Sequence, residues 1–441
     1  MNVLIVGGGG REHTLAWSLT KSKKVGKLFC APGNAGIAKL ARCLPVSAED
    51  IEGIVKAVKE NSVDFVVIGP EAPLAAGLVD ILEKAGIKAF GPNKKCAQLE
   101  ASKAFTKNFL EKHGIPTAKY KEFTGKEELL AAIGVFGFPM VLKADGLAAG
   151  KGVIIAETDE EARAAVEQMM GEKIFGAACE KVVVEEFLKG TEASVLCFVD
   201  EKTIVPMKSA QDYKRIFDGD EGPNTGGVGA YSPSLLFDET LNKRVMDEIL
   251  APTLSGLKSD GLDYKGVLYA GLMITADGPK IIEFNIRFGD PETQVVLPGL
   301  ETDLLDILLA VSENRLNEID IKWNGKKAVC VALTSGGYPG SYETGFVING
   351  LENVDGDVLV FHAGTAADHI CDELSCRMAT VTAGGRVLGV TALADTHDEA
   401  RKKAYENAAK ISFEGMQYRK DIGLYSELLD SAEVKKAYLG I

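Results

Sequence analysis

The sequence lacks the usual marks of a secreted, zinc-binding or membrane protein. Its eight cysteines are scattered, without a C-x-x-C pair or a histidine at zinc-ligand spacing, so we expect reduced thiols in the core. No apolar run approaches the roughly 20 residues of a bilayer-spanning helix. The first residues, MNVLIVGGGG, contain no basic leader or cleavage site. These absences predict a soluble cytoplasmic protein with no membrane partner.

Positive charge is also scarce. Lysine and arginine total 49 against 63 aspartates and glutamates, which gives a formal net charge of −14. Such an acidic chain is not expected to bind nucleic acid, although a local basic pocket for a phosphorylated metabolite is compatible with it. The five histidines form no triad and no metal-ligand spacing, so we assign none of them a catalytic role.

Residues 1–101 alternate short apolar runs with amphipathic stretches, which predicts a parallel α/β sheet of the βαβ type. The expected strands are Val3–Val6, Lys27–Ala31, Phe65–Ile68 and Lys88–Phe90, and the expected helices are Glu12–Leu19, Ile51–Glu60 and Leu78–Ala85. The strands end in the turns GGGG, APGN, IGPE and FGPN. Because ligands bind at the carboxyl ends of such strands, we expect these turns to line one cleft.

A different pattern begins near Ser102. The expected elements are a helix at Ser102–His113, strands at Met140–Ala144, Gly152–Ile155 and Lys181–Phe187, a helix at Asp159–Met170, a hairpin of Gly271–Thr275 and Lys280–Asn285, and a helix at Asp398–Ile411. Between them, Ser209–Tyr231 is predicted to be one long Gly-rich loop, and such loops are usually functional. Its candidate substrate-holding residues are Asp212, Lys214, Thr225 and Gly226.

The run Gly7–Gly10 admits three interpretations. A dinucleotide fingerprint would need a third glycine where Glu12 or His13 stands, and an acidic residue after the second strand, which ends at Asn34 instead. NAD binding is therefore disfavoured. A tight turn without a ligand is the second interpretation. A site for a phosphate-bearing substrate is favoured, because backbone N–H groups at a helix N-terminus attract anions and Arg11 could add charge.

The segment KADGLAAGKG, residues 143–152, is the strongest local signal for phosphate binding. A buried strand ends at Lys143, and the loop after it presents three glycines and Lys151. A polyphosphate needs close backbone approach, positive charge and a loop that can close. The spacing does not fit a Walker loop, and an ordinary hairpin loop with a surface lysine is the alternative.

Polar residues alternate at the end of the later apolar strand, at Glu283, Asn285 and Arg287. Burying these side chains costs free energy unless they have partners. The oxygens of Glu283 and Asn285 suit Mg²⁺ or Mn²⁺, and Arg287 could stabilise charge on a transferred phosphoryl group. A structural Glu–Arg pair is the alternative.

Two other segments are weaker signals. Lys103, at a helix start, would by itself be a solvated lysine. Glu185 and Glu186 end a valine-rich strand whose edge could offer N–H and C=O groups to a purine, and Glu192 lies just beyond, where it could take ribose hydroxyls. An exposed acidic strand end is the alternative.

Nine motifs in order give these signals a common meaning. They are GGGREH (8–13), APGNAG (31–36), GPEAPL (69–74), KADGLAAGKGV (143–153), EEFL (185–188), GPNTGGVGAYSP (222–233), EFNIRFGDPETQ (283–294), SGGYPG and YRKDIG. As a set they resemble the glycinamide ribonucleotide synthetase family of phosphoribosylamine–glycine ligases, almost over the full length. The resemblance implies an α/β architecture with an ATP-grasp fold. Its parts are an N-terminal Rossmann-like (pre-ATP-grasp) domain at 1–101, an ATP-grasp domain at 102–325 with a lid at about 122–190, and a small C-terminal α+β domain at 326–441.

The resemblance also implies roles for individual residues. The ATP-contacting positions are Lys103, Lys143, Glu185, Glu186, Leu188 and Glu192, to which the phosphate-loop interpretation adds Lys151. The metal positions are Glu283 and Asn285, and Arg287 and Lys143 are the expected catalytic residues. The phosphoribosyl group is assigned to Gly9, Arg11, Asn34 and Glu71, with Asp212, Lys214 and Asp290 nearby. The strand Tyr269–Met273 carries no carboxylate, so two protein ligands, phosphates and water would have to hold the metal.

The implied reaction converts ATP, glycine and 5-phosphoribosylamine into ADP, phosphate and glycinamide ribonucleotide through glycyl phosphate, a step of purine synthesis. Mg²⁺ or Mn²⁺ would assist, and we expect a monomer. One rival is another ATP-grasp ligase or carboxylase, although no Met-Lys-Met carrier motif is present. The other is a non-catalytic nucleotide-binding module, which would not need Lys143, Glu283, Asn285 and Arg287 together.

Overall fold

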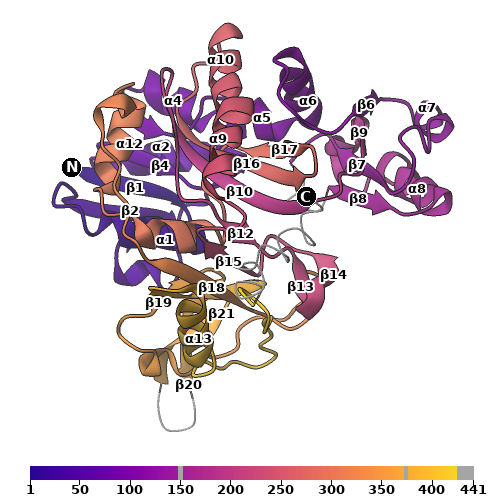
Figure 1. Ribbon diagram of the computed structural model, residues 1–441. Helices are drawn as coiled ribbons and strands as arrows, with labels where there is room; N and C mark the ends of the chain where they lie inside the picture. Colours follow the sequence, from indigo (N-terminus) through magenta and orange to yellow (C-terminus); the bar gives the residue numbers. More distant parts are fainter. Residues whose placement is uncertain (148–151, 372–375, 425–441) are drawn as a thin grey trace.

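The computed structural model describes residues 1–147, 152–371 and 376–424. The N-terminal part, indigo to violet in Figure 1, is a five-stranded parallel sheet with the strand order β3-β2-β1-β4-β5. Its strands are β1 (Asn2–Gly7), β2 (Lys27–Pro32), β3 (Arg42–Cys43), β4 (Phe65–Ile68) and β5 (Lys88–Phe90). Its helices are α1 (Gly10–Leu19), α2 (Ile51–Glu60), α3 (Glu71–Ala76), α4 (Leu78–Lys84) and α5 (Gln98–Ala101). The predicted parallel α/β sheet is confirmed, and continuous apolar runs form its central strands because helices cover both faces.

The middle of the chain forms an antiparallel sheet of the order β11-β10-β16-β17. Its strands are β10 (Thr191–Val199), β11 (Ile204–Pro206), β16 (Gly266–Thr275) and β17 (Gly278–Asn285). Its helices are α6 (Lys103–Lys112), α9 (Glu239–Arg244), α10 (Ala251–Ser259), α11 (Thr293–Val296) and α12 (Leu304–Ser312). The predicted hairpin is confirmed, since β16 pairs with β17 and Gly278 adopts a φ of 130° in the turn.

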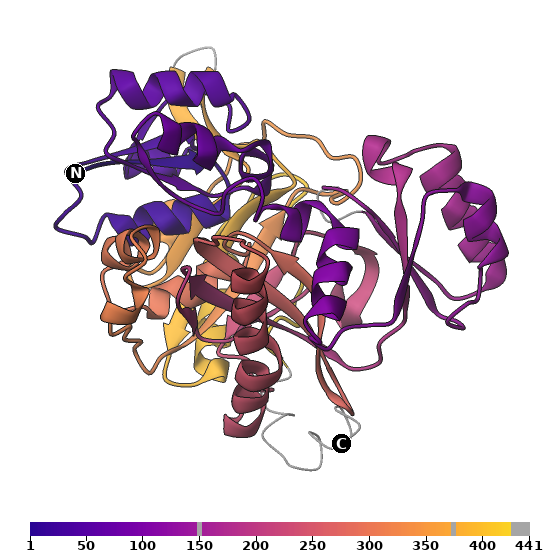
Figure 2. The same ribbon diagram turned by 90° about the horizontal axis from the view of Figure 1, so that it is seen from above.

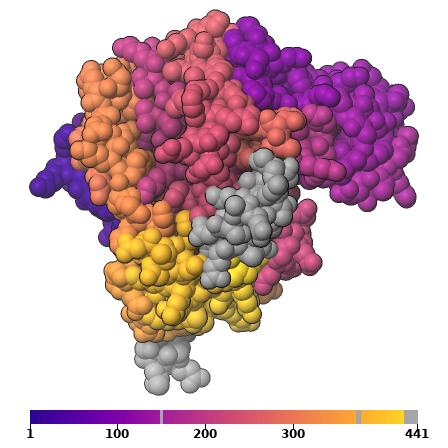
Figure 3. All heavy atoms as spheres, in the orientation of Figure 1, coloured from indigo at the N-terminus to yellow at the C-terminus, as the bar shows by residue number. Residues whose placement is uncertain are grey.

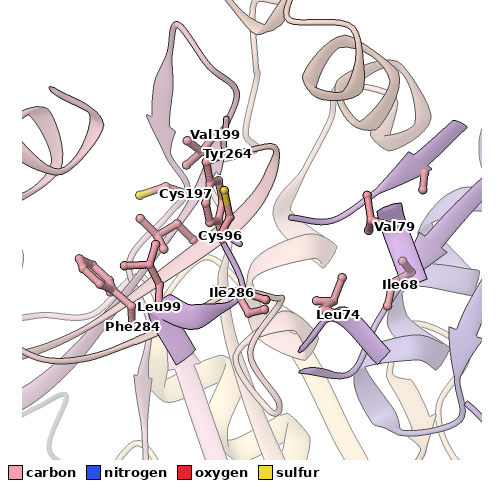
Figure 4. Packing of buried hydrophobic residues seen from close by; sticks show 14 of the residues in the cluster. Ile68, Leu74, Val79, Cys96, Leu99, Cys197, Val199, Tyr264, Phe284 and Ile286 are labelled. Carbon is pink, nitrogen blue, oxygen red and sulfur yellow. The ribbon is translucent and has the colours of Figure 1, made fainter. Parts of the chain in front are cut away.

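The N-terminal and middle sheets share one hydrophobic core. Figure 4 shows Ile68, Leu74 and Val79 from the N-terminal part in the same cluster as Val199 and Phe284 from the middle sheet. All five side chains are almost completely buried. Dense packing of this kind fixes the N-terminal turns relative to the strand that carries the predicted metal ligands.

A smaller subdomain stands out to one side of the molecule, as Figures 2 and 3 show. Its sheet has the order β6-β9-β7-β8, with β6 (Tyr120–Phe123), β7 (Met140–Ala144), β8 (Val153–Ala156) and β9 (Val182–Glu186), and its helices are α7 (Lys126–Ala131) and α8 (Asp159–Val166). The Thr158 hydroxyl caps α8 by accepting the Glu161 N–H. The subdomain has its own core, which includes Leu142, Ala162 and Val184, so its packing does not depend on the main core.

The C-terminal part is built on a five-stranded sheet of the order β12-β15-β18-β22-β19. Its strands are β12 (Gln211–Asp212), β15 (Gly229–Ser232), β18 (Lys327–Thr334), β19 (Leu359–His362) and β22 (Arg386–Ala394), with a second hairpin of β20 (Thr365–Cys371) and β21 (Cys376–Thr382). Helix α13 (His397–Ala408) begins with a capping box between Thr396 and Glu399 and packs Ala400 and Ala404 inward.

The prediction of one long loop at Ser209–Tyr231 is wrong. This segment forms β12, a hairpin of β13 (Arg215–Phe217) and β14 (Glu221–Asn224), and the start of β15. β15 pairs with β18, about a hundred residues later in the chain. Strands of only two to four residues are too short for an alternating signal, and distant pairing decides their structure.

Two buried histidines join the N-terminal and C-terminal sheets. The Nδ1 atom of His13 accepts a hydrogen bond of 2.7 Å from the His362 backbone N–H, and the His362 ring lies 3.0 Å from the Thr365 hydroxyl. Burial and the nearby Lys39 ammonium lower the pKa of His13 to about 4. Burial and the neighbouring His13 lower the pKa of His362 to about 3. Both rings therefore support the junction in their neutral form.

This junction predicts a loss of stability in mild acid. The unfolded chain binds a proton on each histidine near pH 6.5, whereas the folded chain binds none until about pH 4, so stability should fall as the pH drops through this window. The expected slope is roughly 1.4 kcal/mol per pH unit for each histidine. His13→Asn keeps an acceptor at the same place without a titrating ring, and should make the slope shallower by that amount in denaturant unfolding between pH 6.5 and 4.5. His369→Asn, at an exposed position, is the matched control. An unchanged slope in His13→Asn would contradict this account.

Candidate active site

The site lies where the projecting subdomain meets the middle sheet. Lys143 is the next-to-last residue of β7, and its ammonium donates a hydrogen bond of 3.1 Å to the carbonyl of Ile282 on β17. Lys103, the first residue of α6 after the N-cap Ser102, donates a bond of 2.7 Å to the Gly146 carbonyl. Both predicted ATP-contacting lysines therefore bridge the subdomain and the main body.

A buried carboxylate holds two lysines at this boundary. Glu185 on β9 forms ion pairs of 2.9 Å with both Lys143 and Lys107. Burial lowers the pKa of Lys107 to about 8, although the Glu185 carboxylate opposes the shift. Removing one charge from such a buried cluster leaves the others uncompensated. Glu185 thus fixes the position of Lys143 at the end of its strand.

The predicted metal ligands lie on one face of β17. The Asn285 amide donates to the Glu283 carboxylate at 3.3 Å, and the Asn285 oxygen accepts from Arg287 at 3.2 Å. The predicted alternation holds for Glu283 and Asn285, whereas Arg287 lies in a bend just beyond the end of β17 and still contacts Asn285. A β-bulge at Ile282 interrupts the pairing with β16, so that Gly271 lies opposite Glu283. The bulge frees the Ile282 carbonyl for Lys143 and directs Glu283 into the cleft.

Glu283 is surrounded by positive charge. Burial alone would raise its pKa, but the ammonium groups of Lys214, Lys143 and Lys103 together lower it. Lys214 in turn forms an ion pair of 3.0 Å with Asp212, whose side chain is almost completely buried. The predicted residues on β7, α6, β12 and β17 therefore converge on one polar cleft.

Two more carboxylates face the same cleft. Glu192 on β10 is exposed to solvent, yet the surrounding protein and the nearby Asp212 and Glu283 raise its pKa, with Lys214 opposing. Glu292 is buried, and its pKa rises to about 7 through burial and repulsion from Asp212. The cleft thus combines cations for phosphates with carboxylates that could hold a cation or accept a proton.

Arg287 is held by two carboxylates. Its guanidinium lies 3.3 Å from Glu71 on α3 and 3.3 Å from Glu100 on α5, and these charges outweigh the effect of burial and raise its pKa. Glu100 also accepts the Ile286 N–H at 2.8 Å. The side chain is 18% exposed. The alternative of a Glu–Arg pair is therefore partly correct, but the partners are Glu71 and Glu100 rather than Glu283.

Asp290 is the meeting point of three parts of the chain. Its carboxylate accepts the Gln294 amide at 2.7 Å and lies 3.5 Å from Arg386 on β22. Burial would raise the pKa of Asp290, but Arg386 and Arg11 lower it. Arg386 also donates to the Gly226 carbonyl at 2.7 Å. Asp290 and Gly226, both predicted substrate-binding residues, thus lie together.

The turn at Thr225 and Gly226 is fixed from within. The Thr225 hydroxyl donates to the Lys214 carbonyl at 2.7 Å and accepts the Gly227 N–H at 3.0 Å. The Gly226 N–H donates to the Tyr338 hydroxyl at 3.2 Å. This turn is therefore tied to the backbone of Lys214, which is consistent with the prediction that both hold substrate.

The N-terminal turn differs from the expected open anion site. Glu12 accepts the Gly9 N–H at 2.6 Å and the Arg11 guanidinium at 2.6 Å. Arg11 is buried, and its guanidinium also donates to the Phe288 carbonyl. A carboxylate therefore already occupies the end of α1, and Arg11 links the turn to the segment after β17.

Asn34 has a framework role. Its amide donates to the carbonyls of Gly8 and His362, and its oxygen accepts the N–H groups of Gly36 and Ile37. These four bonds use its side chain fully and shape the turn that follows β2. Any contact of this turn with a ligand would involve backbone groups.

Two further predicted ATP residues, Glu186 and Leu188, lie at the edge of the cleft. The Glu186 carboxylate points away from Lys143 and accepts the Lys119 N–H at 3.0 Å. Leu188, just after β9, is half-buried. At this strand end, backbone groups rather than the Glu186 carboxylate are suited to a purine. Lys151 lies outside the described residues.

The donor set at Glu283 and Asn285 fits a hard divalent cation. Both side chains present oxygen atoms, and they are adjacent. Among the described residues, no group of three or more His, Cys, Asp or Glu side chains is arranged to hold a metal ion. Two protein oxygens would therefore need phosphate and water oxygens to complete the coordination. In the same described ranges, none of the helices combines the length and apolar character that crossing a bilayer requires.

Several residues of the site were not predicted from the sequence. Lys107 follows Lys103 by four positions on one helix, a spacing that places both on one face. Glu12 follows the predicted substrate residue Arg11, and Glu100 precedes the predicted ATP residue Lys103 by three positions. The contacts of both carboxylates depend on tertiary structure. Arg386 lies in the Gly-rich turn TAGGRVLG, and only the topology brings it to Asp290.

The fold and a match of residues 101–293 to the model of an ATP-grasp (A) domain define an ATP-grasp protein, a class that binds ATP and uses a divalent metal. Biotin carboxylases share the fold: the biotin carboxylase domain of the Hydrogenobacter thermophilus 2-oxoglutarate carboxylase superposes with a TM-score of 0.73 over 100% of this chain and 97% of that chain, at 16% identity. At this identity the likeness concerns the fold alone.

The chain belongs to the phosphoribosylglycinamide synthetase family. Models of the family match its N domain at residues 1–100, its ATP-grasp (A) domain at 101–293 and its C domain at 328–425. A phosphoribosylamine–glycine ligase from Halalkalibacterium halodurans is 48% identical over 423 residues, which cover 96% of each chain. A trifunctional purine biosynthetic protein from Gallus gallus is 49% identical over 96% of this chain and 42% of its own length. The crystal structure of a phosphoribosylamine–glycine ligase from Thermotoga maritima superposes with a TM-score of 0.83 at 36% identity, over 96% of this chain and 100% of that chain.

Proposed function

We propose that this chain is an ATP-dependent ligase that joins glycine to 5-phosphoribosylamine, giving glycinamide ribonucleotide, ADP and phosphate in purine biosynthesis. The observation that carries the proposal is the opposition of Glu283 and Asn285 on β17 to Lys143 and Lys103 across one cleft. Membership of the family supports the same reaction.

The chemistry explains why ATP is needed. A carboxylate is anionic and has a poor leaving group, so an amine does not attack it. Attack of a glycine carboxylate oxygen on the γ-phosphorus forms glycyl phosphate and releases ADP. The amine of phosphoribosylamine then attacks the glycyl carbonyl, phosphate leaves, and the nitrogen loses a proton. Water must be excluded meanwhile, because it would hydrolyse the acyl phosphate.

In this proposal the two lysines bind the phosphates of ATP. Lys143 belongs to the subdomain and Lys103 to the main body, so closure of residues 122–190 as a lid would bring the Lys143 ammonium onto phosphates that also lie against Lys103. Arg287 stabilises charge on the transferred phosphoryl group. Mg²⁺ or Mn²⁺, when held by Glu283 and Asn285, supplies further charge neutralisation.

The adenosine would lie at the end of β9, with its base against backbone groups at Glu186 and Leu188 and its ribose near Glu192. Lys151 and Glu185 complete the proposed ATP set, Lys151 by direct contact and Glu185 by holding Lys143.

The substrate side is proposed to be the cleft between the N-terminal turns and β22. Asp212, Lys214, Thr225, Gly226 and Asp290 would line it, and Glu71 would adjoin it through Arg287, which the contacts among these residues support. Gly9, Arg11 and Asn34 contribute by shaping the turns, since their side-chain or backbone donors are already engaged.

We further propose three units at residues 1–101, 102–325 and 326–441, although β12 and β15 complete the sheet of the third. We also propose that the chain acts in the cytoplasm, as a monomer, on small molecules and without nucleic acid. The acidic net charge of −14 supports the last point.

The test is phosphate release from ATP, with each substrate omitted in turn. Sustained release should require glycine and phosphoribosylamine together, and the product should contain both. Full turnover without phosphoribosylamine, or with a different carboxylate in place of glycine, would point to another ATP-grasp ligase. ATP binding without turnover under any combination would indicate a nucleotide-binding module.

A further inference from the structure

The motif YRKDIG, residues 418–423, is placed behind the substrate cleft. Arg419 has a completely buried side chain. It donates two bonds, of 2.7 and 2.6 Å, to the Asp421 carboxylate, one of 2.6 Å to Asp220, and one of 3.0 Å to the Arg215 carbonyl. Burying an arginine so fully is stable only when nearly every donor is satisfied.

Most of these partners hold the β13–β14 hairpin. Asp220 and Arg215 belong to it directly, and Asp421 also accepts the Gly219 N–H at 2.9 Å. The Lys420 N–H donates to Asp218 at 2.7 Å. The C-terminal motif thus binds the hairpin along its length.

The same motif supports the strand that enters the hairpin. The Arg419 guanidinium stacks 4.8 Å from the Tyr213 ring, and the Tyr213 hydroxyl accepts the Gly423 N–H at 3.0 Å. Successive side chains of an extended segment point to opposite sides. Tyr213 therefore faces the motif, while Asp212 and Lys214 face the cleft, where they form their ion pair.

The motif is in turn fixed to α13. Tyr405 donates its hydroxyl hydrogen to the Arg419 carbonyl and accepts the Ile422 N–H, and Arg401 donates to the Ile422 carbonyl. Helix α13 therefore supports the YRKDIG motif, and the motif in turn supports Tyr213.

We propose that Arg419 is a positioning residue for the reaction, which holds Asp212 and Lys214 in register from the back of the strand that carries them. The inference rests on the proposed function, because it takes Asp212 and Lys214 to be substrate-binding residues. The Arg419 guanidinium bonds to Asp421, Asp220 and Arg215 and not to Glu283 or Asn285, so its loss should affect the use of glycine and phosphoribosylamine more than the binding of ATP.

The test compares Arg419→Lys and Asp220→Asn with the wild-type chain. Arg419→Lys keeps the charge but cannot form the two-pronged contact with Asp421. Asp220 is 62% exposed and has a φ of 57°, which asparagine tolerates, so Asp220→Asn should fold normally. Lys420→Ala, at an exposed position within the same motif, is the matched control.

We expect Arg419→Lys to lower kcat/KM for glycine and phosphoribosylamine by about tenfold or more, while the dissociation constant of ATP changes by less than about threefold. Asp220→Asn should lower kcat/KM for the same two substrates by about threefold without weakening ATP binding. Lys420→Ala should change neither quantity. If Arg419→Lys does not fold, the kcat/KM values and the ATP dissociation constant of Asp220→Asn test the inference instead.

Unchanged kcat/KM in folded Arg419→Lys, or equal losses in ATP binding and substrate use, would overturn the inference. Wild-type turnover separates the two hypotheses. An active wild type with an unaffected variant refutes only the role of Arg419, whereas a wild type that releases no phosphate with all three substrates refutes the proposed function.

Discussion

Arg287→Ala is expected to lower kcat by about a hundredfold or more, while the dissociation constant of ATP changes by less than about threefold. Glu71 and Glu100 hold the guanidinium beside Asn285, at the end of the strand that carries Glu283. A charge fixed in advance stabilises the transition state without reorganisation, so its loss affects turnover more than ground-state binding. Steady-state kinetics and nucleotide titration measure the two quantities.

The controls for Arg287 separate chemistry from folding. Without the guanidinium, Glu71 and Glu100 lose their shared partner, which should cost about 3–5 kcal/mol of stability. Assays therefore belong at a temperature where unfolding curves show the variant folded. Lys280→Ala removes a cation from the same strand that pairs with the exposed Asp277, and should leave kcat unchanged. Wild-type turnover in folded Arg287→Ala would remove Arg287 from the mechanism.

Glu283→Gln is the second change with a large expected effect. The substitution keeps the shape of the side chain but removes the negative charge that Lys214, Lys143 and Lys103 surround. We expect kcat/KM for ATP to fall by about a hundredfold to a thousandfold, and the metal concentration for half-maximal activity to rise. Activity measured against Mn²⁺ concentration at fixed ATP tests both.

A matched isosteric change distinguishes this effect from general damage. Glu60→Gln, at a side chain that is 62% exposed near the end of α2, should leave metal dependence and turnover unchanged. If Glu283→Gln kept the metal dependence of the wild-type chain, Glu283 would not be a metal ligand.

The regular elements could be predicted from the sequence because their signals are local. The apolar runs of β1, β4 and β7 and the capped starts of α6 and α13 coincide with the expected ranges. The segment Ser209–Tyr231 could not be predicted, because its strands are short and pair with β18 from a distant part of the chain. Local patterns contain no information about such partners.

In the candidate site, too, local patterns predicted individual residues but not the distant partners that they contact. Lys143, Glu283, Asn285 and Arg287 attracted attention because polar groups at the ends of apolar strands need partners, but the sequence did not identify the partners. The expected ATP contact of Glu185 stays a prediction, and its ion pairs with two lysines could not be predicted from the sequence. Arg386 reaches Asp290 only through the order of β15, β18 and β22 in one sheet.

The central claim is that one cleft binds the triphosphate between the cations at Lys143 and Lys103 and the oxygens at Glu283 and Asn285. A crystal structure with Mn²⁺ and a non-hydrolysable ATP analogue tests it most directly, because the anomalous signal of Mn²⁺ locates the metal independently of the protein. We predict a peak at about 2.2 Å from a Glu283 oxygen and the Asn285 oxygen, with the γ-phosphate within hydrogen-bonding distance of Lys143. A metal and polyphosphate bound elsewhere, with Glu283 and Asn285 contacting neither, would contradict the account.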